Sequence, residues 1–410
     1  MTISHACRHI IEDLDHNDLH RHFTGKGVQS WLLCAACHQN VLSDVTVQLH
    51  ELNADTLGRL LKYYYFETIS GLPHFAQRPL EAIGPSSIIH LDGPRLSRIA
   101  AMPDQRWLGY TEEGALEILT IDSAQPTRQI VTHYRDDRTD RPLRPIIDPT
   151  GRFVALVQDF GRFGAVIDLQ TGQRTMALDA GAYHSEQVPF SACFVVHDGA
   201  PVLIHRTDWN RLDASDPMTG KLLTSRGPTS YRKGEQRPSH YLDYFHGPLH
   251  LSPSGRFILD DGWVWQPFGV ISTFEVRQWL STNVWETEDG SSLKTFPHTY
   301  EMERGVAWLS DEQIVVEHRC ELAPPENTKV GFLVDSSGKE IRPVAGLAGR
   351  FFHHPSRLFT VDLDGLAIWD TNDWARIGFL PGFRPTVQHR QRQELAQLDG
   401  DKLVTWRYLT

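Results

Sequence analysis

The chain has 410 residues, of which 40% are apolar, 22% charged and 10% aromatic. This composition is that of a globular protein and excludes collagen-like, coiled-coil and wholly disordered chains. Lys and Arg number 40 against 51 for Asp and Glu, so the formal net charge is −11. A chain this acidic is not expected to bind nucleic acid or an anionic membrane surface directly.

The first residues, MTISHACRHIIEDLDHNDLH, contain no basic stretch followed by an apolar one, so the sequence predicts no secretory signal. No apolar run approaches the roughly 20 residues of a membrane-spanning helix. The cysteines number five, and two of them form a C-x-x-C motif. This pattern favours metal binding in a reducing compartment over a disulfide framework, and it predicts a cytoplasmic protein.

The strongest chemical motif joins Cys7-x-His9 to Cys34-x-x-Cys37. A C-x-x-C turn lets two thiolates bind one ion, and a second pair completes the tetrahedron that structural zinc prefers. We therefore predict a structural Zn²⁺ bound by Cys7, His9, Cys34 and Cys37, which would supply folding energy to a small module. The alternatives are ordinary packing or redox thiols, or another histidine in place of His9. The histidines that could replace it are His5, His16, His20, His22 and His38.

This motif, with Trp31 between its two halves, resembles zinc fingers of the ubiquitin-protease type over about 35 residues. The later ligand pairs of the larger fingers are missing, so the resemblance does not imply ubiquitin binding. Downstream, residues 45–69 have helical periodicity, with Asp44 placed to cap the helix. Residues 71–85 contain three prolines and two glycines and are predicted to be a linker. We thus expect a zinc-binding, partly helical module over residues 1–80.

From residue 85 to 410 the sequence pattern is that of an all-β protein, because short apolar runs alternate with turns rich in Pro, Gly, Asp, Asn and Ser. One unit recurs: a turn, an apolar strand, a second turn and a further strand that often ends in Asp. Seven copies begin at Pro103, Asp148, His197, Ser252, Leu309, His354 and Arg392.

Seven copies give roughly 45 to 50 residues each, the period of four-stranded propeller blades. A blade buries its apolar residues against the next one, so the ring must close. The last copy is cut short by the end of the chain. We expect SIIHLDGPRL, just after the linker, to supply its outer strand. The fold class is therefore all-β, a seven-bladed β-propeller with a small N-terminal module; the alternatives are six or eight blades, or a β-sandwich with extra strands.

The strings SPSGRF, DPTGRF and LAIWDTNDW resemble the WD40-type repeat, with its SPDG turn and its strand ending in Trp-Asp. The resemblance covers most of residues 85–410 and points to divergent bacterial WD40-like propellers. Trp369-Asp370 is the one true WD dipeptide, and the usual Gly-His pair is absent at the expected places. The resemblance implies protein–protein binding as the default role.

Several side chains could have chemical roles, but a structural role is the better interpretation of each. His353-His354 is interpreted as a pair of turn residues, since adjacent strand residues point to opposite faces and chelate poorly. Asp260-Asp261 precedes Gly262 and is interpreted as a hairpin turn in preference to an acid–base pair. The tryptophans of the Trp-rich stretch are interpreted as blade core in preference to a binding platform. They are Trp263, Trp265 and Trp279.

The segment FRPTVQHRQRQE is basic within an acidic chain, through Arg384, Arg390 and Arg392. It is interpreted as a solvated outer strand or loop, with a docking patch for an acidic partner as the alternative. The chain contains no GxSxG, HExxH, Walker A or Rossmann motif.

We expect a non-enzymatic scaffold or recognition subunit of a multiprotein complex, which binds protein partners through the propeller face. The zinc module would either cap the propeller or dock a second partner. The alternative is a hydrolase or lyase with His, Asp and Glu side chains converging at the central channel. A third hypothesis makes the zinc module the recognition element and the propeller its platform.

Overall fold

The computed structural model describes three N-terminal strands, residues 75–78 and residues 86–408. Short gaps within the last range lie at 122–125, 140, 233, 265–267, 298–303, 320–328, 337 and 339. These strands, β1 (Ser4–His5), β2 (His20–Phe23) and β3 (Ser30–Leu33), form a separate sheet. The predicted zinc ligands Cys7, His9, Cys34 and Cys37 and the predicted helix over 45–69 lie outside the described residues.

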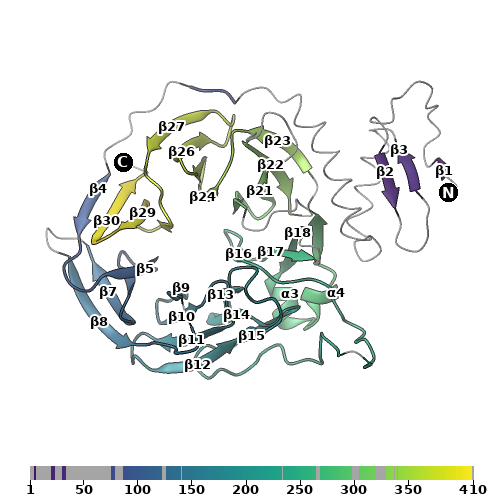
Figure 1. Cartoon of the computed structure of the whole chain (residues 1–410), viewed down its shortest axis with the longest axis horizontal. Coiled ribbons are helices and arrows are strands. Elements are labelled where there is room, and N and C mark those ends of the chain that lie inside the picture. Colours follow the sequence, from purple (N-terminus) through teal and green to yellow (C-terminus); the bar gives the residue numbers. More distant parts are fainter. Residues whose placement is uncertain are drawn as a thin grey trace.

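Seven sheets follow one another around a ring, which is the propeller that the repeat predicts (Figure 1). The strands of blades 1 to 3 are β5 (Leu96–Ala101), β6 (Trp107–Thr111), β7 (Ala115–Thr120) and β8 (Thr127–His133); β9 (Arg144–Ile147), β10 (Phe153–Val157), β11 (Phe163–Asp168) and β12 (Arg174–Asp179); and β13 (Ala192–His197), β14 (Ala200–Asp208) and β15 (Arg211–Ser215).

Blades 4 to 7 continue the ring in the same order, each with four antiparallel strands. They are β16 (Leu249–Leu251), β17 (Phe257–Val264), β18 (Phe268–Glu275) and β19 (Lys294–Pro297); β20 (Val306–Trp308), β21 (Gln313–Arg319), β22 (Lys329–Asp335) and β23 (Glu340–Ala345); β24 (Arg350–His354), β25 (Arg357–Val361), β26 (Gly365–Asp370) and β27 (Arg376–Pro381); and β28 (Val387–His389), β29 (Glu394–Asp399), β30 (Lys402–Arg407) and β4 (Ser87–His90).

Each of the seven predicted copies supplies the second and third strands of one blade. The predicted closure is confirmed as well, because β4, which comes from the start of the described propeller, pairs antiparallel with β30 at its end. The seventh blade is thus built from both ends of the propeller sequence, and its closure leaves no open edge between the two ends.

Two turns that suggested the repeat have the local geometry their sequences require. In DPTG, the Asp148 carboxylate accepts hydrogen bonds from the backbone N–H groups of Thr150 and Phe153, at 2.8 and 2.5 Å. In SPSG, the Ser252 hydroxyl accepts one from Phe257 at 3.1 Å. Both turns end on a glycine with φ near +75° to +78°, a left-handed conformation that favours glycine.

The hydrophobic core lies between neighbouring blades. Leu108 of blade 1 and Val154 of blade 2 belong to one fully buried cluster, and Trp107 of blade 1 shares another with Leu403 of blade 7. Each blade therefore buries its apolar side chains only when the next blade is present, which is why the ring must close.

The predictions for the tryptophans and for Asp260-Asp261 have different outcomes. Trp263 and Trp279 are 2% and 0% exposed, so their assignment to the core is confirmed, whereas Trp265 lies outside the described residues. The hairpin turn assigned to Asp260-Asp261 is wrong, because both residues lie inside the long strand β17 and are buried. Tertiary partners of the two carboxylates, described below, outweigh the local preference of Asp-Gly for turns.

Blade 3 has three strands in the described part of the chain, and an irregular segment over residues 216–248 follows β15 in place of the fourth. This segment begins beside β15, where Leu222 forms an isolated bridge with Ser215. Two short helices, α3 (Val276–Ser281) and α4 (Glu286–Asp289), lie in the connection between β18 and β19 of blade 4. No helix in the described part is long and apolar enough to span a membrane.

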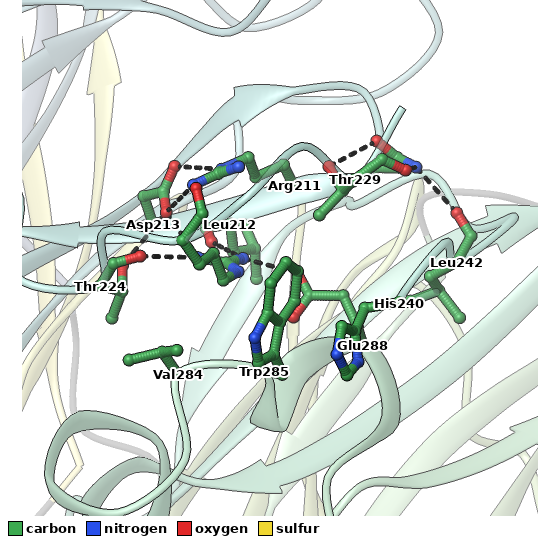
Figure 2. Close-up of polar contacts among 12 residues, drawn as sticks. Arg211, Leu212, Asp213, Thr224, Thr229, His240, Leu242, Val284, Trp285 and Glu288 are labelled. Atoms are coloured by element: carbon green, nitrogen blue, oxygen red, sulfur yellow. Dashed lines mark hydrogen bonds and ion pairs between the residues drawn. The ribbon is translucent and has the colours of Figure 1, made fainter. Parts of the chain in front are cut away.

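Buried charges fix this segment between blades 3 and 4. The Arg226 guanidinium donates to Asp213 Oδ1 at 2.6 Å and to Glu288 Oε1 at 2.5 Å, and all three side chains are at most 3% exposed. Figure 2 shows Asp213, Thr224 and Glu288 drawn together from β15, the segment and α4. Burial alone would raise the pKa of Asp213, but the arginine partners lower it below its usual value.

The described residues 75–78 of the predicted linker pack against the outer edge of blade 6. The Phe75 ring meets Trp369 edge-on at 5.2 Å between centroids, and the Arg376 guanidinium lies 4.9 Å from the centre of the same ring. This contact attaches the N-terminal part of the chain to a defined place on the propeller.

Candidate interaction site at the central channel

The first strands of neighbouring blades contact one another around the ring and enclose a cavity of about 2160 Å³. Residues of the first strands of blades 2 to 7 line it, as expected for the central channel of a propeller. Because the strands of each blade alternate in direction, the turn between the second and third strands lies at the same end of the channel as the connection to the next blade. We call this end the channel mouth.

Two acidic side chains at the channel accept hydrogen bonds from neighbouring segments. Asp261 of β17 accepts hydrogen bonds from the Arg304 guanidinium at 3.0 and 2.5 Å, and both side chains are buried. Glu317 of β21 accepts the backbone N–H groups of Gly305 and Gly349, at 2.8 and 2.9 Å. These bonds join β17 and β21 to the connections that lead into blades 5 and 6, so the two carboxylates link neighbouring blades around the channel.

Two further ion pairs lie at the channel. Arg144 donates to both carboxylate oxygens of Asp159, at 2.7 and 2.9 Å. Lys329 of blade 5 donates to Asp362 of blade 6 at 2.6 Å. Burial alone would raise the pKa of Asp362, but the Lys329 ammonium and backbone N–H groups lower it below its usual value, so this carboxylate is ionised at neutral pH.

Two histidines line the channel without joining these acids. Burial, with a smaller contribution from the charge of Arg390, lowers the pKa of His353 to about 4. Burial also lowers the pKa of His250. Both imidazoles are therefore neutral at pH 7. Among the residues that the structure describes, no three His, Cys, Asp or Glu side chains are grouped so as to hold a metal ion.

The channel mouth carries an exposed apolar side chain on a rigid turn. Leu363, between β25 and β26, is 87% exposed and lines the cavity opening. The turn is held by the Asp362 carboxylate, which accepts the N–H groups of Asp364 and Gly365 at 2.8 and 3.2 Å, and by its Lys329 ion pair. Arg384, which leads into the inner strand of blade 7, also lines this end.

The basic segment around residue 390 is not the outer strand predicted from the sequence, and its arginines do not form one patch. It contains the inner strand β28 of blade 7, not an outer strand. Arg384 precedes this strand and Arg390 follows it, so the two lie at opposite ends of the channel. Arg392 donates to Glu394 at 2.8 Å and is only 10% exposed in its side chain.

The His353-His354 pair also behaves as strand geometry requires. Both are the last residues of β24, before the turn to β25. His353 lines the channel, whereas the His354 ring lies 5.2 Å from that of Tyr408. The interpretation against a chelating pair is therefore supported by their different surroundings.

Sequence reasoning missed the residues that shape the channel. Arg304 and Glu317 carry no local motif, because their partners come from other blades. Leu363 had a usable signal, an apolar residue at the centre of an Asp-x-Asp-Gly turn, where polar residues are usual.

No family model and no curated protein sequence matches the chain. Among solved structures, a chain of the mitotic checkpoint complex is similar with a TM-score of 0.53 and 13% identity, over 83% of this chain and 99% of that chain. The β-propeller domain of Cps50 (Swd1) from Myceliophteria thermophila has a TM-score of 0.50 and 12% identity, over 79% and 100%.

A chain of hydrazine synthase from Kuenenia stuttgartiensis is similar to the same degree, with a TM-score of 0.50 and 13% identity, over 78% of this chain and 97% of that chain. At these identities the likeness establishes the fold and leaves the function to the site. Together with the seven blades and their closure, it identifies the described part of the chain as a seven-bladed β-propeller.

Proposed function

We propose that the protein is a non-enzymatic scaffold or recognition subunit of a multiprotein complex, and that it binds a protein partner at the channel mouth. The observation that carries this proposal is the contrast between the channel wall and its rim. The wall carboxylates Asp261 and Glu317 are bonded to the connections between blades, whereas the rim presents Leu363 to solvent.

Leu363 has two properties that favour recognition. Its turn is fixed by backbone hydrogen bonds to Asp362, so little conformational entropy is lost when a partner covers it. It is also flanked by charge, since the Asp364 side chain is 74% exposed and Arg384 lies nearby on the same rim. An apolar anchor surrounded by polar groups is the usual anatomy of a protein interface.

The test is a quantitative pull-down from cells of the native host with the tagged full chain. We expect a stoichiometric protein partner that Leu363→Asp reduces at least tenfold. Ile130→Asp is the matched control, because Ile130 is 56% exposed on the outer strand β8, away from the channel. Retention of the partner by Leu363→Asp would contradict the proposed surface, and recovery of no stoichiometric partner would contradict the scaffold role.

The N-terminal module completes the proposal. A structural Zn²⁺ on Cys7, His9, Cys34 and Cys37 would order this module without a large core. Its attachment to blade 6 through Phe75 suits either a cap or a second docking element. A chain lacking residues 1–45 distinguishes the two: a soluble propeller that loses its partner assigns recognition to the module, and an insoluble chain assigns it a stabilising role.

A further inference from the structure

Arg206, on strand β14, is a buried cation whose hydrogen-bonding capacity is largely unused. The residue is 2% exposed, and Nη1 donates to the backbone oxygen of His246 at 3.3 Å. Nε and Nη2 are buried and have no hydrogen-bond partner in the described part of the chain. The guanidinium also lies 5.7 Å from the centre of the Phe190 ring, whose face accepts no conventional hydrogen bond.

Other buried arginines of this propeller are neutralised directly. Arg226 lies 2.6 Å from a carboxylate oxygen of Asp213, and Arg304 lies 2.5 Å from Asp261. Among the described residues no carboxylate lies within ion-pair distance of Arg206. Burial lowers the pKa of Arg206 to about 10, so the side chain is still a cation at neutral pH. A buried cation without a direct partner is costly, which calls for an acceptor beside it.

The acids nearest to this guanidinium have partners of their own. Asp260 accepts the His246 imidazole at 2.5 Å and the Gly247 N–H at 2.9 Å. Asp208 accepts the N–H of Trp209 at 2.8 Å and the hydroxyl of Ser230 at 3.0 Å. These carboxylates attract Arg206 at a distance and leave its Nε and Nη2 groups unsatisfied.

Two more buried polar atoms without partners in the described residues belong to the same neighbourhood. They are Ser191 Oγ and His246 Nε2. The Arg206 backbone N–H donates to the Ser191 backbone oxygen at 2.9 Å, and its Nη1 donates to the His246 backbone oxygen at 3.3 Å, so both segments lie beside Arg206.

We propose that this neighbourhood is a binding site for a small inorganic anion of the size of chloride. The guanidinium and the Ser191 hydroxyl supply the donors, and the anion supplies the charge that no carboxylate brings within reach. Bulk water does not reach the site, because Ser191 is 0% and Arg206 2% exposed, so the ligand is small and enclosed. Such an anion would join β14 of blade 3 to the connection from blade 2 that carries Ser191. This proposal is independent of partner binding at the channel mouth.

The test is thermal unfolding of the full chain at constant ionic strength, with chloride replacing gluconate, which is too bulky to enter. In the wild type we expect the melting temperature to rise by about 2 °C per tenfold increase in chloride above the dissociation constant. Arg206→Met should abolish this rise, and Ser191→Ala should reduce it. Arg256→Met, which alters an exposed arginine, should retain the wild-type slope.

A second measurement uses the unaltered protein, so it holds even if Arg206→Met fails to fold. Crystals soaked in bromide should give an anomalous peak within hydrogen-bond distance of the Arg206 guanidinium and the Ser191 hydroxyl. Equal chloride dependence in the wild type and Arg206→Met would overturn the proposal. So would a bromide-soaked crystal with no anomalous peak beside Arg206, where ordered water would then satisfy the guanidinium.

Discussion

Ile89 pairs with Leu403 in the closing blade, and the neighbouring Leu91 N–H donates to the Asp401 oxygen at 2.9 Å. The partly buried Ile89 packs against a cluster that also contains Trp107 of blade 1. Four residues near the start of the propeller thus complete a sheet made otherwise from residues 387–407. The closing contact covers the backbone edge of β30 and part of the apolar junction between blades 7 and 1.

This relationship predicts that β4 is required for stability although it contributes few residues. A chain of residues 86–410 retains β4, and one of residues 92–410 lacks it. Both lack the N-terminal module and residues 75–78, so they differ in the closing strand and the residue that follows it. We expect the longer chain to unfold cooperatively and the shorter one to melt at a lower temperature and expose apolar surface. Equal melting curves by circular dichroism would show that the ring closes without β4.

The regular part of the fold was predictable because its signals are local. The Asp148 and Ser252 turns bond to N–H groups within five residues, so a short string such as DPTGRF contains all that the turn requires. The seven copies then fixed the number of blades, and the missing outer strand of the last copy indicated where the ring closes.

The channel was not predictable in the same way, because its contacts join residues far apart in the sequence. Asp261 was taken for a turn residue on the local evidence of Gly262, yet its partner Arg304 comes from the connection to the next blade. Nor does the sequence reveal that Arg384 and Arg390 flank an inner strand and face opposite ends of the channel. The direction of that strand depends on its place in the closed ring.

The buried ion pairs of Arg226 give a second prediction. Arg226→Met leaves the Glu288 carboxyl group buried without its cation, so we expect a loss of about 3–5 kcal/mol in the free energy of unfolding. Urea unfolding followed by tryptophan fluorescence would measure it. Arg256→Met removes an exposed ion pair with Glu275 and should cost less than about 1 kcal/mol.

A double variant separates lost charge from lost packing. Arg226→Met with Glu288→Leu removes the uncompensated carboxylate as well, so it should recover part of the stability lost in the single variant. If the double variant is no more stable than Arg226→Met, the stabilising effect of Arg226 comes from its stem and its hydrogen bonds to Leu212 and Thr224.

Stability should also fall in mild acid because of His205. This histidine is 4% exposed, and burial lowers its pKa from 6.5 to about 4. Between those values the unfolded chain binds the proton and the folded chain does not, so acid favours unfolding. The contribution of neutral His205 to the free energy of unfolding is complete above about pH 6.5 and is lost as the pH falls towards 4. Its size is on the order of 3 kcal/mol.

His205→Gln isolates this effect because the amide can still bond to Ser215, whose hydroxyl lies 3.0 Å from the imidazole Nε2. We expect the variant to lose less stability than the wild type between pH 6.5 and 4 in urea titrations. His90→Gln, at an exposed position on β4, should follow the wild-type curve. Identical pH dependence in His205→Gln and wild type would contradict the prediction, because it would mean that the folded chain binds the proton on this imidazole as readily as the unfolded chain does.

The N-terminal C-x-H and C-x-x-C motifs predict about one zinc ion per chain. Protein purified without added metal should contain it, and Cys34→Ser/Cys37→Ser should lose it, because removal of two thiolates leaves too few ligands for a closed site. His9→Gln tests the remaining assignment: retention of zinc there would transfer the fourth position to another N-terminal histidine. Metal analysis by mass spectrometry, run beside the melting curve of the propeller, distinguishes loss of the ion from general unfolding. Well-folded wild type without zinc would refute the metal site. The contact of Phe75 with blade 6 would then stand without a zinc module beside it.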